Sequence, residues 1–274
     1  MGIAEDILGP DGWHAAMAAL VWQMELGATE LIGDDPVNNY DLTVEAPWQA
    51  RSATRGATPA VAIASPAEVA ARSAETALAD ARSLAAQAAS LEDLRDAMHR
   101  YDHCELKRGA KNLVFADGLP GARVMLVGEA PGRDEDIEGR PFVGRAGKLL
   151  DAMFAAIGLQ RTSSDTQHAI YITNVVPWRP AMNRDPTPDE VAMMRPFLQR
   201  HIELADPDVI VALGNTPCAA LLGKTGILRM RGTWDSVFGK PVLPMVHPAY
   251  LLRNPAAKRE AWADLLTLKA RLKT

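Results

Sequence analysis

The sequence predicts an α/β protein with a mainly parallel central sheet flanked by helices, and with a helical N-terminal extension. From residue 120 onward, strand-like apolar runs alternate with helical runs, a pattern typical of a parallel sheet covered on both faces. Each strand-like run ends in a glycine-rich or polar segment, as at the ligand-binding edge of such sheets. The chain has 274 residues and 48% hydrophobic content, so we expect a sizeable core.

The first 89 residues are expected to form helices and a linker outside the sheet. Residues 1–45 predict a helical extension, because residues 13–31 have apolar side chains at helical spacing. Residues 46–64 are rich in Ala, Pro, Ser and Thr and are expected to be a flexible linker. Residues 65–89 are expected to form an Ala-rich helix, because a capping-box pattern stands at the start of this segment. None of these segments indicates a chemistry.

Residues 90–274 are expected to form the domain that contains the sheet. Ser90 is a capping residue and begins a helix that is expected to end near Arg100. The predicted strands cover residues 124–127, 170–176, 209–213 and 242–246. The predicted helices that separate and follow these strands cover residues 146–157, 188–205, 217–222 and 255–272.

The charge of the chain is unevenly distributed. A net charge of −5 taken alone argues against a nucleic-acid partner. However, residues 1–100 hold six basic and 15 acidic residues, a net charge of −9. Because the whole chain has 29 basic and 34 acidic residues, residues 101–274 hold 23 and 19, a net charge of +4. The second part of the chain is therefore compatible with binding to phosphate groups.

Cysteine content and hydropathy indicate the compartment. Two cysteines, Cys104 and Cys218, are too few for a disulfide scaffold. No apolar run approaches the roughly 18 residues of a membrane span, and the N-terminus lacks the basic and apolar regions of a secretory signal. We therefore expect a cytoplasmic, monomeric protein that does not contact membranes.

The segment that follows the first strand carries the strongest local signal. Residues 128–132 contain two glycines and a proline, which force a sharp turn. An acidic cluster and Phe142 follow before the next helix. This connection is about three times longer than the two to six residues that usually join a strand to a helix, which favours a functional loop.

The ends of the four predicted strands bring Glu129, Phe142, Asn174 and His247 within reach of one pocket. The amide of Asn174 can match both edges of an imide such as N3–H and O4 of uracil, and Phe142 can stack on a flat ring. A neutral His247 can donate to a developing oxyanion, helped by N–H groups of residues 128–132. Each residue alone has a structural interpretation, as turn former, loop plug or cap, but their joint placement favours a functional site.

Four ordered motifs carry a resemblance to a known family. In chain order they are GEAPGRDEDIEGRPFVGRAGKLL, YITNVVPWRP, DPDVIVALG and HPAYLLR. With this order and spacing the chain resembles the family 4 branch of the uracil-DNA glycosylases over about residues 90–272. The resemblance implies a uracil-DNA glycosylase-like fold, a DNA partner that contains uracil, and a role in base excision repair. It also implies base flipping, because an enzyme that acts on a stacked base must first extrude it.

The resemblance also implies roles for individual residues around the base. Glu129 belongs to the turn that positions water and contacts uracil, and the backbone of Gly128 and Ala130 in the same turn helps to bind the base. Phe142 is expected to stack on uracil, and Asn174 is expected to recognise its polar edge.

Further roles are implied for the last motif. His247 is expected to stabilise negative charge on uracil O2 as the bond breaks, which makes it catalytic together with Glu129 and Asn174. A wedge that fills the space left by the flipped nucleotide is expected from Tyr250, Leu251 and Leu252, with Arg253 near a phosphate.

The chain departs from the family pattern at the iron–sulfur ligands. The resemblance implies a [4Fe–4S] cluster held by four cysteines, but the corresponding positions are Tyr101, Cys104, Trp178 and Met194. One thiolate cannot hold such a cluster, so the sequence predicts that the cluster is absent, with no other metal or cofactor, and that the three large side chains fill its volume. The alternative of a zinc site formed by His99, His103 and Cys104 fits no standard spacing of ligands.

The mechanism is predicted only in part. The four motif ends contain no lysine, since Lys148 lies a turn into the following helix, so we expect hydrolysis without strand cleavage. Ala130 occupies the position where the family 1 glycosylases, which this turn distantly resembles, place a water-activating Asp. The residue that positions water stays open among Glu129, Asp134, Glu135 and Asp136.

Two other functions remain as alternatives at this stage. The first is a protein that binds uracil or abasic sites in DNA with little turnover. Covalent capture of DNA is disfavoured, because the segment PWRPAMNRDPTP after the second motif contains no histidine. The second is a nucleotide-metabolising or phosphate-binding α/β protein, although the chain lacks a P-loop or GxGxxG motif.

Overall fold

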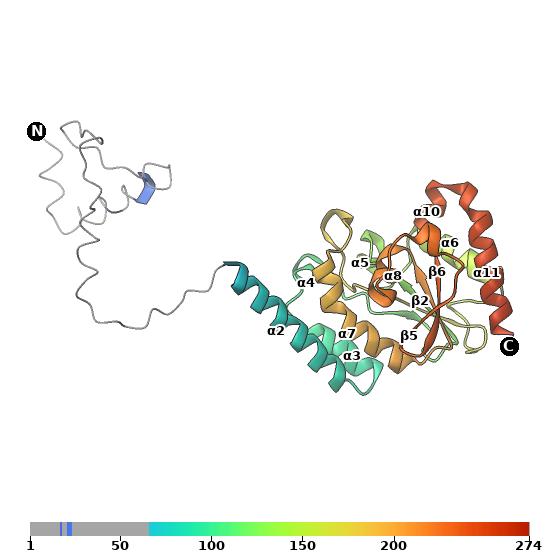
Figure 1. Cartoon of the computed structure of the whole chain (residues 1–274), viewed down its shortest axis with the longest axis horizontal. Coiled ribbons are helices and arrows are strands. Elements are labelled where there is room, and N and C mark those ends of the chain that lie inside the picture. The colour runs from blue at the N-terminus through green and yellow to red at the C-terminus, as the bar shows by residue number, and fades with distance from the viewer. Residues whose placement is uncertain (1–16, 18–20, 24–65, 274) are drawn as a thin grey trace, which may run out of the picture. The chain divides into compact units, whose positions relative to one another are not determined.

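The structure is a computed structural model that describes residues 17, 21–23 and 66–273 (Figure 1). The chain divides into two compact units, Met1–Ile63 and Ala64–Thr274. In the first unit the described residues are helical, but most of the helix predicted over residues 13–31 lies outside them. The linker predicted over residues 46–64 lies entirely outside the described residues. The following paragraphs concern the second unit.

A six-stranded sheet forms the centre of the second unit. Its strand order is β1-β3-β2-β4-β6-β5, in which β3, β2, β4 and β6 are parallel and the two edge strands are antiparallel. The strands are β1 (Asp117–Gly118), β2 (Val124–Gly128), β3 (Ile170–Asn174), β4 (Val209–Leu213), β5 (Asp235–Val237) and β6 (Lys240–Met245). The predicted mainly parallel sheet is therefore confirmed.

Helices cover both faces of this sheet, with α3 and α7 on one side and α6 and α11 on the other (Figure 1). Local capping explains where two of them begin. Ser90 forms a capping box with Asp93 at α3, and Thr187 forms one with Glu190 at α7. The α-helices are α2 (Pro66–Gln87), α3 (Leu91–Arg100), α4 (Leu106–Gly109), α5 (Arg133–Glu138), α6 (Arg145–Ala155), α7 (Pro188–Ala205), α8 (Asn215–Leu222), α9 (Ile227–Met230), α10 (Pro248–Arg253) and α11 (Lys258–Leu272).

The core lies on both sides of the sheet because alternate residues of a strand point to opposite faces. In β2, Met125 and Val127 belong to the core cluster that includes α3 and α7, whereas Val124 and Leu126 belong to the cluster that includes α6 and α11. All five residues of β2 are buried. This explains why the strand reads as a continuous apolar run, as expected for a central parallel strand.

The structure differs from the sequence prediction at three places. The helix predicted over residues 255–272 is interrupted, with a 3₁₀ turn at Pro255–Ala257 before α11. The polar loop after β2 contains the short helix α5, which Glu135 caps through the N–H of Gly132. The edge strands β1 and β5 were not predicted, because two or three residues carry no periodic pattern.

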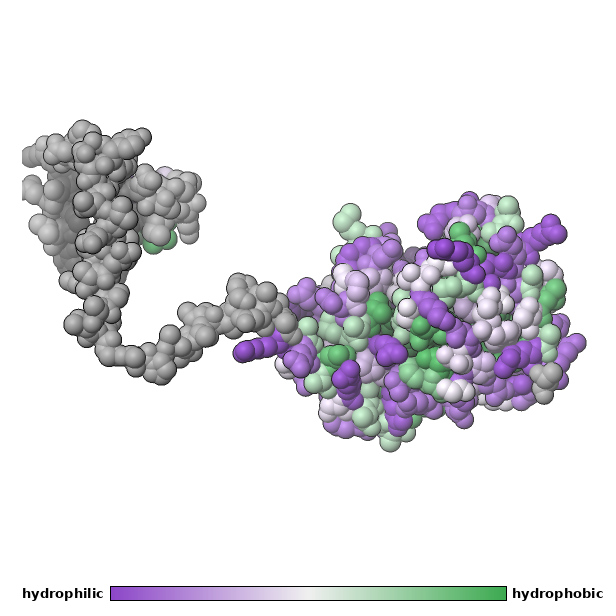
Figure 2. Space-filling view, in the orientation of Figure 1, coloured by the Kyte–Doolittle hydropathy of each residue, from purple (hydrophilic) through white to green (hydrophobic). Residues whose placement is uncertain are grey.

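The surface of the second unit is mixed. Figure 2 shows hydrophobic residues interspersed among hydrophilic ones on one face. Within the described residues, no helix combines the length and the apolar content needed to cross a membrane. The exposed large hydrophobic side chains of the second unit include Ile137, Met182, Leu228, Leu252, Trp262 and Leu266.

Candidate active site

A cavity of about 730 Å³ lies at the carboxyl ends of the parallel strands. This is the edge at which α/β sheets commonly bind ligands. The residues that the sequence predicted for the site come together here from the ends of β2, β3 and β6 and from the loop before α6. The cavity is lined by Glu129, Ala130, Phe142, Asn174 and His247, among others.

Gly128 forms the point where the two predicted base-binding side chains meet. The parallel register of β2 and β3 places Gly128 opposite Asn174. A Cβ atom on Gly128 would lie 2.6 Å from Cε2 of the Phe142 ring and would also collide with Oδ1 of Asn174. Glycine is therefore required here so that an amide and an aromatic face can approach each other at the end of β2.

The backbone of Phe142 has an unusual conformation. Its φ angle is 55°, in the left-handed region that costs a non-glycine residue roughly 1–2 kcal/mol. The side chain is 6% exposed, and its ring stacks on that of His247 with centroids 5.4 Å apart and planes inclined by 30°. The surrounding structure therefore holds the ring in a fixed place beside the cavity.

His247 is prepared to act as a neutral hydrogen-bond donor. It caps α10, and its Nδ1 accepts a hydrogen bond from the backbone N–H of Ala249 at 3.2 Å, so the proton lies on Nε2. Burial lowers the pKa of His247 to about 4, and the charge of Arg253 contributes in the same direction. At neutral pH the ring is uncharged and can donate from Nε2 to a developing oxyanion.

Glu129 is the acidic residue best placed to act on water. Its Oε2 accepts a hydrogen bond from Oγ1 of Thr216 at 2.5 Å, and its other oxygen has no hydrogen-bond partner among the described residues. Burial raises the pKa of Glu129, and the nearby charge of Asp185 adds to this effect. A carboxyl group with a raised pKa and an unbonded oxygen in a cavity suits the binding of water or a proton.

The other three acidic residues considered for positioning water have different surroundings from Glu129. Glu135 accepts hydrogen bonds from the backbone N–H groups of Gly132, Val143 and Gly144, at 2.9–3.1 Å. It lines the cavity, but these bonds show that it holds the loop. Asp136 is buried and accepts from two backbone N–H groups at 2.8 and 3.1 Å. Asp134 is exposed.

Sequence reasoning missed two residues that tune this site, Thr216 and Asp185. Thr216 lies in the first turn of α8, directly after β4, and its position at a strand end was visible in the sequence. Its partnership with Glu129 spans 87 residues, and no local pattern signals it. Asp185 belongs to the segment after the second motif, which also lines the cavity.

The predicted wedge residues lie on α10 but do not share one orientation. Tyr250 and Arg253 line the cavity, and Leu252 is 37% exposed. Leu251 is 1% exposed and belongs to a core cluster with Val246. Its burial does not fit the wedge role predicted for it, because a side chain fixed in the core cannot enter a base stack.

The fold and the site together define an α/β protein with a cavity at the carboxyl edge of its sheet, where an aromatic ring and an amide lie beside a neutral histidine. Comparison with known proteins places the chain within a family. Residues 115–266 match the model of the uracil DNA glycosylase superfamily. The chain therefore belongs to this superfamily.

Individual relatives confirm the predicted resemblance to family 4. The chain is similar to the type-4 uracil-DNA glycosylase of Thermotoga maritima, with 42% identity over 167 residues that cover 60% of this chain and 84% of that protein. The corresponding protein of Archaeoglobus fulgidus is 41% identical over 184 residues, 64% and 89% of the two chains. That of Saccharolobus solfataricus is 38% identical over 194 residues, 67% and 87%.

These relatives correct one prediction. The type-4 enzymes to which the chain is similar are iron–sulfur enzymes, which contradicts the predicted absence of a cofactor, and that prediction is withdrawn. The four positions hold Tyr101, Cys104, Trp178 and Met194, all buried in the larger core cluster. They offer one thiol and do not form a four-thiolate ligand set. The described part of the chain contains no group of three or more His, Cys, Asp or Glu side chains that could hold a metal ion.

Proposed function

We propose that this chain removes uracil from DNA by hydrolysing the N-glycosidic bond, leaving an abasic site in an unbroken strand. Its membership of the uracil DNA glycosylase superfamily and its similarity to type-4 uracil-DNA glycosylases support this function. The observation that carries the proposal is the meeting of Asn174 and Phe142 over Gly128 at the cavity. An amide beside an aromatic face matches the edge and the face of uracil.

The base is recognised by complementarity of hydrogen bonds. The Asn174 side chain donates to O4 and accepts from N3–H of uracil, while Phe142 covers one face of the ring. Cytosine has an amino donor where uracil has O4, so the N–H group of the Asn174 amide would face another donor and stay unpaired. A site that pairs with a polar edge in this way discriminates strongly against bases that lack it.

His247 and Glu129 have separate roles in the hydrolysis, His247 at the departing base and Glu129 at the attacking water. As the bond between C1′ and N1 breaks, its electron pair passes to uracil, and Nε2–H of His247 donates to O2, where the negative charge develops. The Glu129 carboxylate holds a water molecule whose oxygen bonds to C1′ and whose proton passes to the carboxylate. The hydrogen bond from Thr216 orients that carboxylate.

Access to the base requires the nucleotide to leave the double helix. The exposed edge of α10 next to the cavity supports a role for Leu252 in filling the vacated space, with Tyr250 beside it and Arg253 near a phosphate. We therefore assign DNA binding and base flipping to these residues of α10 at the rim of the cavity. The monomeric state and the cytoplasmic location stay predictions.

The experiment is excision of uracil from an end-labelled oligonucleotide, followed by treatment with alkali to cleave abasic sites. We expect strand cleavage with the wild-type protein only after alkali, and a strong loss with Asn174→Ala. Gln199→Ala is the matched control, because this amide bonds Glu203 on the surface of α7 and should not change excision. Retention of the labelled uracil-containing oligonucleotide by the wild type, without any product, would show a binding protein instead.

A further inference from the structure

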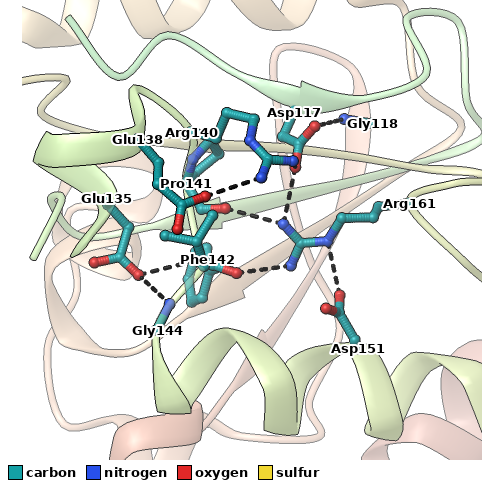
Figure 3. Close-up of polar contacts among 11 residues, drawn as sticks. Asp117, Gly118, Glu135, Glu138, Arg140, Pro141, Phe142, Gly144, Asp151 and Arg161 are labelled. Atoms are coloured by element: carbon teal, nitrogen blue, oxygen red, sulfur yellow. Dashed lines mark hydrogen bonds and ion pairs between the residues drawn. The ribbon is translucent and has the colours of Figure 1, made fainter. Parts of the chain in front are cut away.

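Arg161 lies behind the loop that carries Phe142, on the side away from Glu135. Figure 3 shows its guanidinium pointing into the backbone of this loop. Its Nη1 donates to the carbonyl oxygen of Pro141 at 3.0 Å, and its Nη2 donates to that of Phe142 at 3.0 Å. The Arg161 side chain is 11% exposed, so water competes little for these bonds.

Two carboxylates hold the guanidinium in place. Nη1 also donates to Asp117 Oδ2 at 3.0 Å, and Nε donates to Asp151 Oδ1 at 2.7 Å. Asp117 is itself fixed, because its other oxygen accepts from the backbone N–H of Gly118 at 2.9 Å. A planar fork held by two acids can present its remaining N–H groups to two carbonyls at fixed angles, which a lysine cannot do.

The contacts of Arg161 converge on the residue whose backbone is left-handed. Phe142 has its carbonyl held by Arg161, while the next two N–H groups are held by Glu135 from the other side. The helix α6 approaches closely as well, since a Cβ on Gly147 would lie 2.9 Å from Cα of Phe142. A strained backbone persists where several such contacts determine it together.

We propose that Arg161 is a positioning residue for base recognition, which acts by holding Phe142 in the conformation that offers its ring to the base. This inference rests on the proposed excision of uracil. Arg161 does not line the cavity and touches no reacting atom, so its whole effect passes through the Phe142 ring.

The test is a double-mutant cycle on the single-turnover rate of uracil excision. Stacking of a base on an aromatic side chain is worth roughly 1–3 kcal/mol, so we expect Phe142→Ala to lower the rate by roughly 5–150-fold. Arg161→Ala should lower it to a similar extent. The double variant should be no slower than Phe142→Ala alone, because Arg161 has nothing to position once the ring is gone.

Two further variants separate positioning from general stability. Arg123 also bonds an acid and a backbone carbonyl, Asp208 and Leu272, but at the opposite end of β2. Arg123→Ala should lower the melting temperature without changing the single-turnover rate. Arg161→Lys keeps the positive charge but loses the planar guanidinium, so its rate should lie between those of the wild type and Arg161→Ala. Arg161→Lys also replaces Arg161→Ala in the test if the alanine variant does not fold.

The affinity for abasic DNA is a second measurement, which a general structural defect would weaken. This product lacks the base, so Arg161→Ala should bind it as tightly as the wild type does, as should Phe142→Ala. The proposal is overturned if Arg161→Ala excises uracil at the wild-type rate, if the effects of the two substitutions multiply in the double variant, or if Arg123→Ala slows excision equally. Wild-type protein that does not excise uracil would instead overturn the proposed function.

Discussion

Two histidines of this protein share a lowered pKa, but we propose different roles for them. His201, on α7, is fully enclosed, and His247, at the start of α10, is partly buried. Burial lowers the pKa of both, to about 3 for His201 and to about 4 for His247. Both rings are therefore neutral at physiological pH, and a lowered pKa does not distinguish the proposed catalytic histidine from the one in the core.

The difference lies in what each ring faces. His201 Nε2 is 2.9 Å from the hydroxyl of Tyr171, and its ring stacks on Phe115 with centroids 4.5 Å apart and planes inclined by 14°. His247 has one nitrogen bonded to Ala249 and lines the cavity beside Phe142. A buried neutral histidine becomes a candidate for catalysis when it borders a space that a substrate can enter.

The largest effect is expected from replacing the cavity histidine. His247→Ala removes the donor to uracil O2 and should lower the single-turnover rate of uracil excision by roughly 10²–10³-fold, the usual cost of losing an oxyanion donor. His247→Gln keeps a neutral N–H donor and should recover part of that rate. A rate for His247→Ala within about twofold of the wild type would remove His247 from the mechanism.

The core histidine should give the opposite result. His201→Ala leaves a cavity beside Phe115 and removes the partner of the Tyr171 hydroxyl, so we expect a loss of about 2–4 kcal/mol in the free energy of unfolding. The rate of excision per folded molecule should stay unchanged. Urea denaturation and single-turnover kinetics on the same preparation measure both quantities, and a slow but stable His201→Ala would contradict the comparison.

Sequence reasoning located the cavity side chains because their signals were strong and independent. Asn174 ends a parallel strand, Glu129 and His247 follow two others, and parallel strands bring their carboxyl ends to one edge. The helix α7 was predicted with its observed bounds, Pro188–Ala205, because a capping box and a proline mark its start.

What escaped prediction depends on tertiary packing. The left-handed backbone of Phe142 and the position of Arg161 arise from contacts between segments about 20 residues apart. The inward orientation of Leu251 follows from the packing of α10 against the core, because six residues are too few for a periodic pattern to show which face is buried. Polar residue types were therefore predicted better than the contacts that orient them.

Acid should destabilise the protein through both histidines. A histidine whose pKa is lowered on folding contributes its full stability above its unfolded pKa of about 6.5. It loses that stability as the pH falls from this value towards the folded pKa, because the unfolded chain takes up the proton first. Folded pKa values of about 4 for His247 and about 3 for His201 predict a loss of about 2 kcal/mol per histidine between pH 6.5 and pH 5. Urea denaturation at both pH values should show a smaller loss in His247→Gln than in the wild type. An equal loss in the two proteins would mean that His247 is protonated in the folded state.

The smallest effect is expected at the rim of the cavity, on the helix that His247 caps. Leu252 is 37% exposed on α10, and Leu252→Ala should lower excision from double-stranded DNA by roughly 3–10-fold, because a shorter side chain replaces less of the lost base stacking. Excision from single-stranded DNA should change less, since no stacked partner strand has to be opened. Leu266→Ala is the matched control, because Leu266 is similarly exposed, at 46%, but lies on α11, whereas Leu252 lies on α10 between the cavity-lining residues Tyr250 and Arg253. Equal losses on the two substrates would show that Leu252 contacts the strand without acting as a wedge.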